Sequence, residues 1–365
     1  MKKNSSKKVK VMYRNTYVEI YLESIKYNVK LLINKYHDYK FFFGVVKADC
    51  YGHANNKIVK IIIDAGCNYL AVATLDEALM IRSEIKDVPI LCLGIINPKY
   101  LYKCLENNIT ITINNYDYLS KIKNKDKRLK MHIKVNSGMN RLGVNNKEDF
   151  NKMFAYAKKN FNLEGIYTHI YNPNNDNSTK KQWKKFEEII SDIDLSSIPI
   201  IHVGASEATE LYVKREYANG CRLGISMYGL VDFPNLNFKS TFSLYSEVIQ
   251  INEVENETVG YNGAYKAEGK ERIAVVAIGY ADGIIRKNTG RDVYINNKKY
   301  KIIGNICMDM MFVKVDNTIK VGDKVVVIKD INHIKKIAKH LDTITYEVIC
   351  SIGKRVPRYI CEKNI

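Results

Sequence analysis

A lysine stands at the end of the first strongly apolar run of the chain. The run FFFGVVKA covers residues 41–48, and its next-to-last residue is Lys47. Apolar surroundings disfavour the charged amine and lower its pKa, and a neutral amine can attack a carbonyl carbon to form an imine. Taken alone, the pattern is more typical of a rim lysine whose stem packs while its amine reaches water.

Further candidate ligand-binding residues lie in or just after four other apolar runs. Each offers a cation, an imidazole, a hydroxyl or a backbone N–H to an anionic ligand. They are Lys134, Arg141, His169, Ser206, Arg222, Gly224 and Ile225. Each residue also has an ordinary explanation, such as an ion pair, a buried histidine or a helix N-cap. Only their combination therefore favours a binding site.

Three tyrosines stand beside glycines or apolar runs in the last third of the chain. Tyr261 lies in VGYNGAY, Tyr280 in AIGYADG, and Tyr346 in TITYEVICSIGKRVPR. The chain has 26 tyrosines, so a single one is more often a packing residue than a catalyst. They become candidates only through the motifs that surround them.

The elements that would position these residues alternate between apolar strand patterns and amphipathic helix patterns. Eight strands are predicted, at residues 41–48, 69–74, 90–94, 109–114, 131–136, 165–170, 200–205 and 221–226. Helical spacing separates them, and a further helix is predicted over LESIKYNVKLLINKY before the first. Eight such units predict a (β/α)8 barrel, in which ligands bind at the carboxyl ends of the strands. A doubly wound open sheet is the alternative, because periodicity does not reveal closure.

The pattern changes after about residue 235. Strands separated by turns follow, interrupted by one short helix at 331–340. We therefore predict a barrel over 16–235 and a mostly β domain over 236–365. The early segment TYVEIYLE also has a strand pattern and is expected to pair with the C-terminal sheet.

In this order, VVKADCYGHA, KVNSGMNRLG, CRLGISMYGL, VGYNGAY, IGYADG, ICMDMM and TITYEVICSIGKRVPR resemble the motifs of alanine racemases. The resemblance runs from about residue 16 to the C-terminus, and the combination is highly specific. It implies a pyridoxal phosphate (PLP) enzyme with a barrel and a β domain. It also implies a head-to-tail homodimer in which both subunits complete each active site.

The resemblance implies a role for each motif residue. Lys47 matches the lysine that holds the cofactor covalently, Arg222 the arginine facing the pyridine nitrogen, and His169 the histidine against the ring. Residues matching the phosphate-binding set are Tyr51, Ser206, Gly224, Ile225 and Tyr346. Residues matching the substrate pocket are Arg141, Tyr280, Met308 and Asp309.

Two further matches concern proton transfer and modification. Tyr261 matches the second catalytic base, which the partner subunit supplies, and Lys134 matches a lysine that is carbamylated in many members. The implied reaction interconverts L- and D-alanine with one base on each face of Cα, and the D-alanine serves cell-wall peptidoglycan. Lys47 would act on the D-isomer and Tyr261 on the L-isomer.

The chain departs from the family pattern around the predicted entry corridor. Asp49 replaces a common Asn, Asn172 and Asn174 follow the histidine motif, and Asn305 stands where Arg is frequent. These changes leave open a serine-preferring or broad-specificity racemase. A decarboxylase with the same two-domain plan is disfavoured by VGYNGAY and ICMD. A PLP-binding protein without catalysis remains a further alternative.

Composition and spacing limit the other classes of protein to which the chain could belong. No apolar run approaches the roughly 20 residues that span a bilayer, and the basic N-terminus lacks the apolar stretch of a signal peptide. The net charge of +18 raises a nucleic-acid alternative, but the lysines are dispersed and no RNA-binding motif accompanies them. The eight cysteines show no metal-binding or redox spacing. We therefore expect a cytoplasmic protein with free thiols, no metal, and no nucleic-acid or membrane partner.

Overall fold

The computed structural model describes residues 13–53 and 56–361. The chain divides into two units. One spans Tyr21–Thr241, and the other consists of Phe242–Cys361 with the segment up to Ile20. The basic N-terminal tail singled out in the sequence lies largely outside the described residues.

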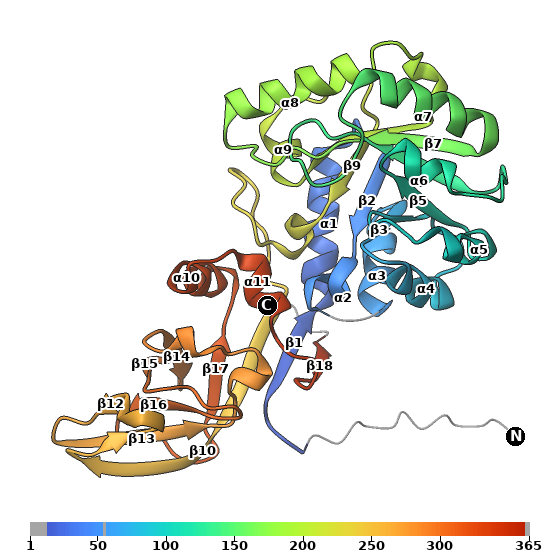
Figure 1. Ribbon diagram of the computed structural model, residues 1–365. Helices are drawn as coiled ribbons and strands as arrows, with labels where there is room; N and C mark the ends of the chain where they lie inside the picture. Colours follow the sequence, from blue (N-terminus) through green and yellow to red (C-terminus); the bar gives the residue numbers. More distant parts are fainter. Residues whose placement is uncertain (1–12, 54–55, 362–365) are drawn as a thin grey trace, which may run out of the picture. The chain divides into compact units, whose positions relative to one another are not determined.

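The first unit is a closed barrel of parallel strands, as predicted (Figure 1). The strands are β2 (Phe41–Val45), β3 (Tyr69–Val72), β4 (Ile90–Cys92), β5 (Ile109–Ile113), β6 (Lys130–Lys134), β7 (Asn162–Tyr167), β8 (Ile200–Ala205) and β9 (Gly220–Leu223). Closure is made by β2 and β9, which pair in parallel from Phe41 opposite Gly220 to Gly44 opposite Leu223. The open-sheet alternative is therefore wrong.

Helices precede, connect and follow the barrel strands. They are α1 (Leu22–Lys35), α2 (Lys47–Tyr51), α3 (Asn56–Asp64), α4 (Leu75–Glu84), η1 (Pro98–Tyr100), α5 (Leu101–Glu106), α6 (Tyr116–Ser120), α7 (Lys147–Asn160), α8 (Asp176–Ile189), η2 (Leu195–Ser197), α9 (Glu207–Leu211) and η3 (Ile225–Tyr228). Local sequence sets several starts. Thr74 and Glu77 form a capping box at α4, and Asn146 caps α7 through the backbone N–H of Asp149.

The second unit is mostly antiparallel β structure. Its strands are β1 (Tyr17–Tyr21), β10 (Phe242–Glu255), β11 (Thr258–Val259), β12 (Tyr265–Lys266), β13 (Lys270–Val276), β14 (Asp292–Ile295), β15 (Lys298–Ile303), β16 (Met311–Val315), β17 (Lys324–Ile328) and β18 (Arg358–Cys361). The sheet order is β13-β16-β15-β14-β17-β10-β1-β18, and β10 also pairs with β13. These pairings close most of the sheet on itself, so few strand edges are left exposed.

The second unit also contains short helices. They are η4 (Tyr261–Gly263), η5 (Tyr280–Asp282), η6 (Arg286–Asn288), α10 (Ile331–Leu341) and α11 (Thr345–Cys350). The helix predicted at 331–340 corresponds to α10. The early strand β1 pairs with β10, from Tyr17 opposite Tyr245 to Ile20 opposite Phe242.

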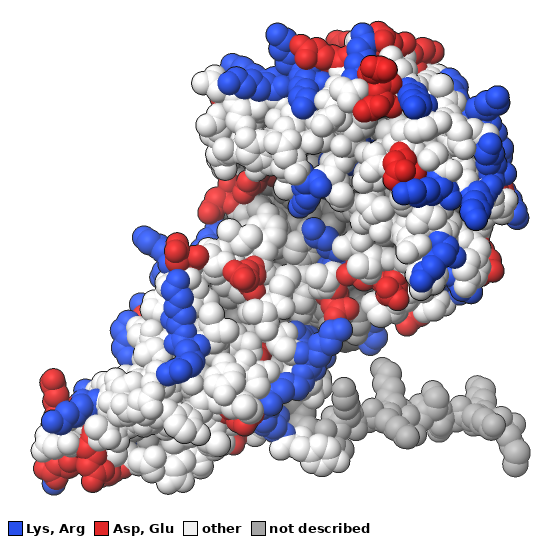
Figure 2. All heavy atoms as spheres, viewed as in Figure 1, with Lys and Arg blue, Asp and Glu red and all other residues white. Residues whose placement is uncertain are grey.

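The structure also shows the state of the cysteines, the distribution of charge and the character of the helices. Five of the eight cysteines are buried free thiols, and no disulfide links the described residues. Figure 2 shows Lys and Arg side chains interspersed with Asp and Glu over the visible face. Within residues 13–53 and 56–361, no helix combines the length and apolar character needed to cross a membrane.

Candidate active site

The segment after Lys47 has an unusual backbone. Ala48, Asp49, Cys50 and Tyr51 have φ values of 51°, 52°, 55° and 55°, which form a left-handed turn that ends at Gly52. Each such non-glycine residue costs about 1–2 kcal/mol, so the surrounding structure must hold the turn in place. Sequence analysis did not predict this turn, because none of its first four residues is a glycine.

Glu77 anchors the left-handed turn to the neighbouring loop. One carboxylate oxygen accepts a hydrogen bond from the backbone N–H of Ala48 at 2.7 Å. The other accepts from the backbone N–H groups of Ala73 at 2.7 Å and Thr74 at 3.2 Å. The carboxylate thus joins the loops that follow β2 and β3 and fixes the position of Lys47.

A small polar cradle lies beside this turn. A Cβ atom added to Gly224 would lie 3.1 Å from the Tyr51 hydroxyl and 3.5 Å from the Ser206 hydroxyl. The Ser206 hydroxyl also lies 3.2 Å from that of Ser226. Residues from the ends of β2, β8 and β9 therefore surround a space that only glycine leaves open. Hydroxyls around such a space suit the phosphate end of a cofactor.

Ser206 does not act as an ordinary helix cap. It occupies the N-cap position of α9, but its side chain makes no capping hydrogen bond, and its φ of 33° is rare for serine. The structural alternative raised from the sequence is therefore wrong. The hydroxyl is directed instead to the cradle.

Arg222 lies buried at the end of β9 with only 3% of its surface exposed. Its Nη1 donates to Nδ1 of His202 at 2.8 Å and to the His202 carbonyl at 2.9 Å. Its Nη2 donates to the carbonyls of Thr168 at 2.8 Å and Val203 at 3.0 Å. His169 Nδ1 lies 3.4 Å from the same Nη2. These contacts place the guanidinium next to the predicted ring-contacting histidine.

Four basic side chains gather around His169. Burial is the largest cause that lowers its pKa to about 2, and the charges of Arg222, Lys134, Arg141 and Lys47 lower it further. The imidazole is therefore neutral at physiological pH. A site with this excess of positive charge favours a ligand that carries phosphate and carboxylate groups.

Lys134 and Arg141 have contrasting environments within this group. Lys134 is 8% exposed, and its amine lies 4.6 Å from the centre of the Tyr167 ring. Burial, followed by the charges of Arg222 and Arg141, lowers its pKa well below the ordinary value. Arg141 is exposed and forms no ion pair with any described residue, so the ion-pair explanation raised from the sequence is not supported.

The lowered pKa of Lys134 has a consequence for stability. Since the unfolded chain binds the proton more readily, Lys134 opposes folding at neutral pH, and the cost falls as the pH approaches about 10.4. In CO2-free buffer, Lys134→Met should raise the urea midpoint at pH 7, with a smaller gain at pH 9.5. The exposed control Lys123→Met should change neither value. A lower midpoint for Lys134→Met at pH 7 would contradict a pKa of Lys134 that is lowered in the folded protein.

A second set of predicted residues lies in the other unit. Tyr261 in η4 is 71% exposed, Tyr280 in η5 is 41% exposed, and Met308 is 53% exposed. The backbone N–H of Tyr280 donates to the Cys307 carbonyl, which holds η5 against the ICMD segment. The amide of Asn305 donates to the Tyr261 carbonyl at 2.9 Å. The departure from the family pattern at Asn305 thus supports the loop that carries Tyr261.

Asp309 and Tyr346 have partners of their own within this unit. Asp309 accepts from Nη2 of Arg355 at 2.5 Å, and Arg355 also pairs with the buried Asp282 at 2.6 Å. Tyr346 lies in α11 and is partly exposed. The sequence pattern did not distinguish α11 from the strands around it.

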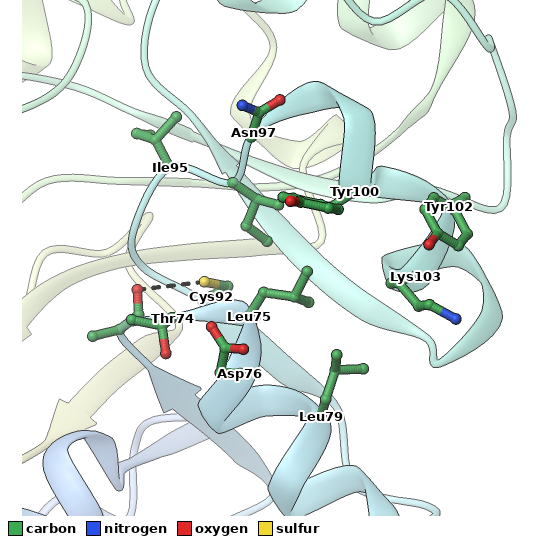
Figure 3. Close-up of a pocket in the computed structure, with 12 residues that line it drawn as sticks. Thr74, Leu75, Asp76, Leu79, Cys92, Ile95, Asn97, Tyr100, Tyr102 and Lys103 are labelled. Atoms are coloured by element: carbon green, nitrogen blue, oxygen red, sulfur yellow. Dashed lines mark hydrogen bonds between the residues drawn. The ribbon is translucent and has the colours of Figure 1, made fainter.

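A separate pocket of about 590 Å³ opens beyond the ends of β3 and β4 (Figure 3). Thr74, Asp76, Asn97 and Tyr100 contribute to its wall, and none of the predicted site residues lines it. It is therefore distinct from the group around Lys47 and Arg222.

Sequence reasoning missed three residues that contact the site indirectly. His202 accepts from Arg222, His132 lies next to His202, and Glu164 lies next to His132. His132 and His202 stand inside predicted strands, and Glu164 directly precedes the strand predicted at 165–170. The available signal was a polar residue in an otherwise apolar strand, which is costly to bury without a partner.

Comparison with known proteins covers both units. Residues 20–232 match the family "Alanine racemase, N-terminal domain", and residues 241–360 match "Alanine racemase, C-terminal domain". Alanine racemase 1 of Bacillus subtilis is 35% identical over 97% of this chain and 95% of its own length. The alanine racemase of Geobacillus kaustophilus is 35% identical over 95% of this chain and 94% of its own.

Solved structures agree with these matches. The alanine racemase of Bacillus anthracis, crystallised with bound L-Ala-P, has a TM-score of 0.90 at 31% identity, with 97% of each chain covered. The histidine racemase of Leuconostoc mesenteroides has a TM-score of 0.85 at 21% identity, covering 96% of this chain and 99% of its own. The second likeness shows a common fold, and a common fold alone does not specify the substrate.

Proposed function

Because the chain belongs to the alanine racemase family, which uses PLP, we propose that it interconverts L- and D-alanine with PLP held at Lys47. The observation that carries this assignment is the convergence of Lys47, Arg222, Lys134 and Arg141 around His169, beside the cradle at Gly224. This donor set fits a cofactor with an aldehyde, an aromatic ring and a phosphate.

Each part of the cofactor has a candidate partner. Lys47 would hold the aldehyde carbon, His169 would lie against the ring, and Arg222 would face the ring nitrogen. The phosphate would be held by Tyr51, Ser206, Gly224, Ile225 and Tyr346. When bound, PLP withdraws electrons from the substrate Cα and makes its proton acidic.

Two residues would then move the proton. The amine of Lys47 takes the α-proton from D-alanine, and the phenol oxygen of Tyr261 takes it from L-alanine. Once one base has taken the proton, the other base delivers a proton to the opposite face, so the configuration at Cα inverts. Arg141 would bind the substrate carboxylate, and Tyr280, Met308 and Asp309 would complete the pocket.

Lys134 would support Arg141 through modification. The neutral form of an amine adds CO2, and the lowered pKa of the buried Lys134 favours that form. The resulting carbamate would be an anion near the Arg141 guanidinium. Intact mass measured with and without bicarbonate tests this proposal. A mass that is unchanged by bicarbonate would remove this detail but not the racemase assignment.

The second base would come from a partner subunit in a head-to-tail homodimer. Tyr261, Tyr280 and Met308 are exposed although they are large and partly apolar, which is typical of a surface covered by a partner. Co-expression of Lys47→Ala and Tyr261→Phe chains tests this directly. Random pairing into shared sites should restore about a quarter of wild-type activity, since half the dimers then contain one intact site.

Separately purified variants should remain inactive after dilution together without subunit exchange. Restored activity in that mixture, or none after co-expression, would contradict shared active sites.

A chiral assay of the PLP-loaded protein with L-alanine, L-serine and L-lysine tests the substrate. D-alanine formed fastest would support the assignment and a role for the D-alanine in peptidoglycan. The exposed Asn172 and Asn174 favour the second candidate, a serine-preferring or broad-specificity racemase, and dominant D-serine or D-lysine would select it. No D-product with cofactor bound would point to the non-catalytic alternative.

A further inference from the structure

A chain of hydrogen bonds runs from Arg222 through the interior of the barrel. His202 Nδ1 lies 2.8 Å from Nη1 of Arg222, and His202 Nε2 lies 2.9 Å from Nδ1 of His132. His132 Nε2 then lies 3.1 Å from the Glu164 carboxylate. The four residues come from the adjacent strands β9, β8, β6 and β7. The chain therefore links the mouth of the barrel to a carboxylate deeper in its wall.

The chemistry of the donors determines the direction in which the hydrogen bonds of this series run. An arginine has no acceptor, so Nδ1 of His202 must accept, and its proton lies on Nε2. His132 must then accept at Nδ1 and donate from Nε2 to Glu164. Both histidines are fully buried, and burial is the largest cause that lowers the pKa of each. Both are therefore neutral, which the direction of the chain requires.

Glu164 is held as an anion at the far end. Burial alone would raise its pKa, but the hydrogen bonds donated by His132 and Tyr69 and the charge of Lys130 lower it. The Tyr69 hydroxyl donates at 2.6 Å, and the Lys130 amine lies 3.6 Å from the second oxygen. These hydrogen bonds thus connect the buried cation of Arg222 to the partly buried anion of Glu164 through two neutral rings.

The barrel interior is shaped to hold these rings. A Cβ atom on Gly165 would lie 2.6 Å from the His132 ring, so glycine is required beside it. The His202 ring stacks between Phe43 at 4.4 Å and Tyr167 at 4.6 Å between centroids. Barrel interiors are usually filled by branched apolar side chains. Polar rings fitted this closely have few alternative orientations.

The hydrogen bonds of Arg222 also determine which of its N–H groups faces the ligand. Four N–H bonds of the guanidinium are directed to His202, Thr168 and Val203. Among the described residues, no acceptor is found for the fifth N–H, at Nε. The acceptors in the barrel wall thereby orient the group so that this single N–H remains for a ring nitrogen.

We propose that Glu164 is a positioning residue for the reaction: through His132 and His202, its negative charge keeps Arg222 oriented and cationic. This inference rests on the proposed function, because Arg222 matters there through the cofactor ring. A well-held cation disfavours a proton on the ring nitrogen, which limits the side reaction that leaves the amino group on the cofactor and releases pyruvate.

The informative variant is Glu164→Gln. Glutamine can still accept from His132 and from Tyr69, so the geometry survives while the charge is removed. We expect kcat/KM for alanine to fall about 10-fold or more, as for other indirect partners of a reactive centre. Pyruvate released per racemisation event should rise by a similar factor, and the absorption spectrum of the bound cofactor should change.

Glu271→Gln is the matched control. Glu271 is a buried carboxylate in the other unit, and it likewise accepts from a tyrosine, Tyr265, and pairs with a lysine, Lys314. Its replacement should lower the thermal midpoint of the cofactor-free protein but leave the cofactor spectrum and the pyruvate ratio unchanged. If Glu164→Gln behaves in the same way, its role is structural and the proposal is overturned.

A second pair of variants covers the case in which Glu164→Gln does not fold. The amide of His132→Gln can accept from His202 and donate to Glu164, whereas His132→Leu can do neither. Retention of the wild-type spectrum by the first and its loss by the second supports the proposal. Wild-type spectra for both would overturn it. Since the spectrum is read without turnover, failure of the wild-type protein to racemise alanine would count against the proposed function alone.

Discussion

Lys47→Ala should abolish racemisation of alanine and prevent covalent capture of PLP. The amine is both the proposed cofactor anchor and the proposed base for the D-isomer, and one general base typically contributes 10²–10⁴-fold. We therefore expect a loss of about 10⁴-fold or more in both directions. The measurements are D-alanine formation by chiral chromatography and the visible absorbance of the PLP-loaded protein.

Lys40→Ala is the matched control for Lys47. Lys40 directly precedes β2, so the two lysines flank opposite ends of the same strand, and barrel chemistry belongs to the carboxyl end. The control should keep its colour and its activity. Added methylamine should partly restore turnover to Lys47→Ala, since it supplies the missing amine. A Lys47→Ala protein with more than a tenth of wild-type activity would refute the assignment of this lysine.

Tyr261→Phe should separate the two proton transfers. Without the phenol, the proton cannot be taken from or returned to the L-face, so racemisation should fall about 10²–10⁴-fold in both directions. Exchange of the α-proton of D-alanine with solvent should continue, because Lys47 alone carries it out. Proton NMR in D2O reads this exchange, and chiral analysis reads the racemisation.

Tyr100→Phe provides the comparison for Tyr261→Phe. Tyr100 is 45% exposed and lines the separate pocket of Figure 3, so its hydroxyl should be dispensable. Equal losses of exchange for D- and L-alanine in Tyr261→Phe would contradict one base on each face. They would indicate that the tyrosine only shapes the pocket.

The barrel was predictable because its strands are buried on both sides. Continuous apolar runs such as YLAVAT and ITITIN mark such strands, and helical spacing between them indicates parallel crossovers. Closure into a barrel was confirmed, although periodicity alone left an open sheet possible. The short helix α11 was not separated from its neighbours, because six residues are too few to establish a period of 3.6.

The candidate site could be predicted only in part from the sequence. Residues at strand ends, such as Lys47, His169 and Arg222, could be selected because barrel ligands bind there. Their proposed roles came from the motif resemblance, and those roles remain to be tested. The left-handed turn at Ala48–Tyr51 could not be predicted, since of its residues only Asp49 has any preference for positive φ, and long-range contacts hold the turn in place.

By itself, the sequence determined the strand and helix periodicity, the two-part organisation and the ordered motifs, since these depend on residues close together in the chain. The tertiary structure alone decided which distant residues meet. His132, Glu164 and His202 are up to 70 residues apart, and only barrel closure with a defined strand register brings them into one hydrogen-bonded chain. The lowered pKa values of Lys134 and His169 were likewise decided by burial and by neighbouring charges. Both effects depend on three-dimensional surroundings, which no local pattern encodes.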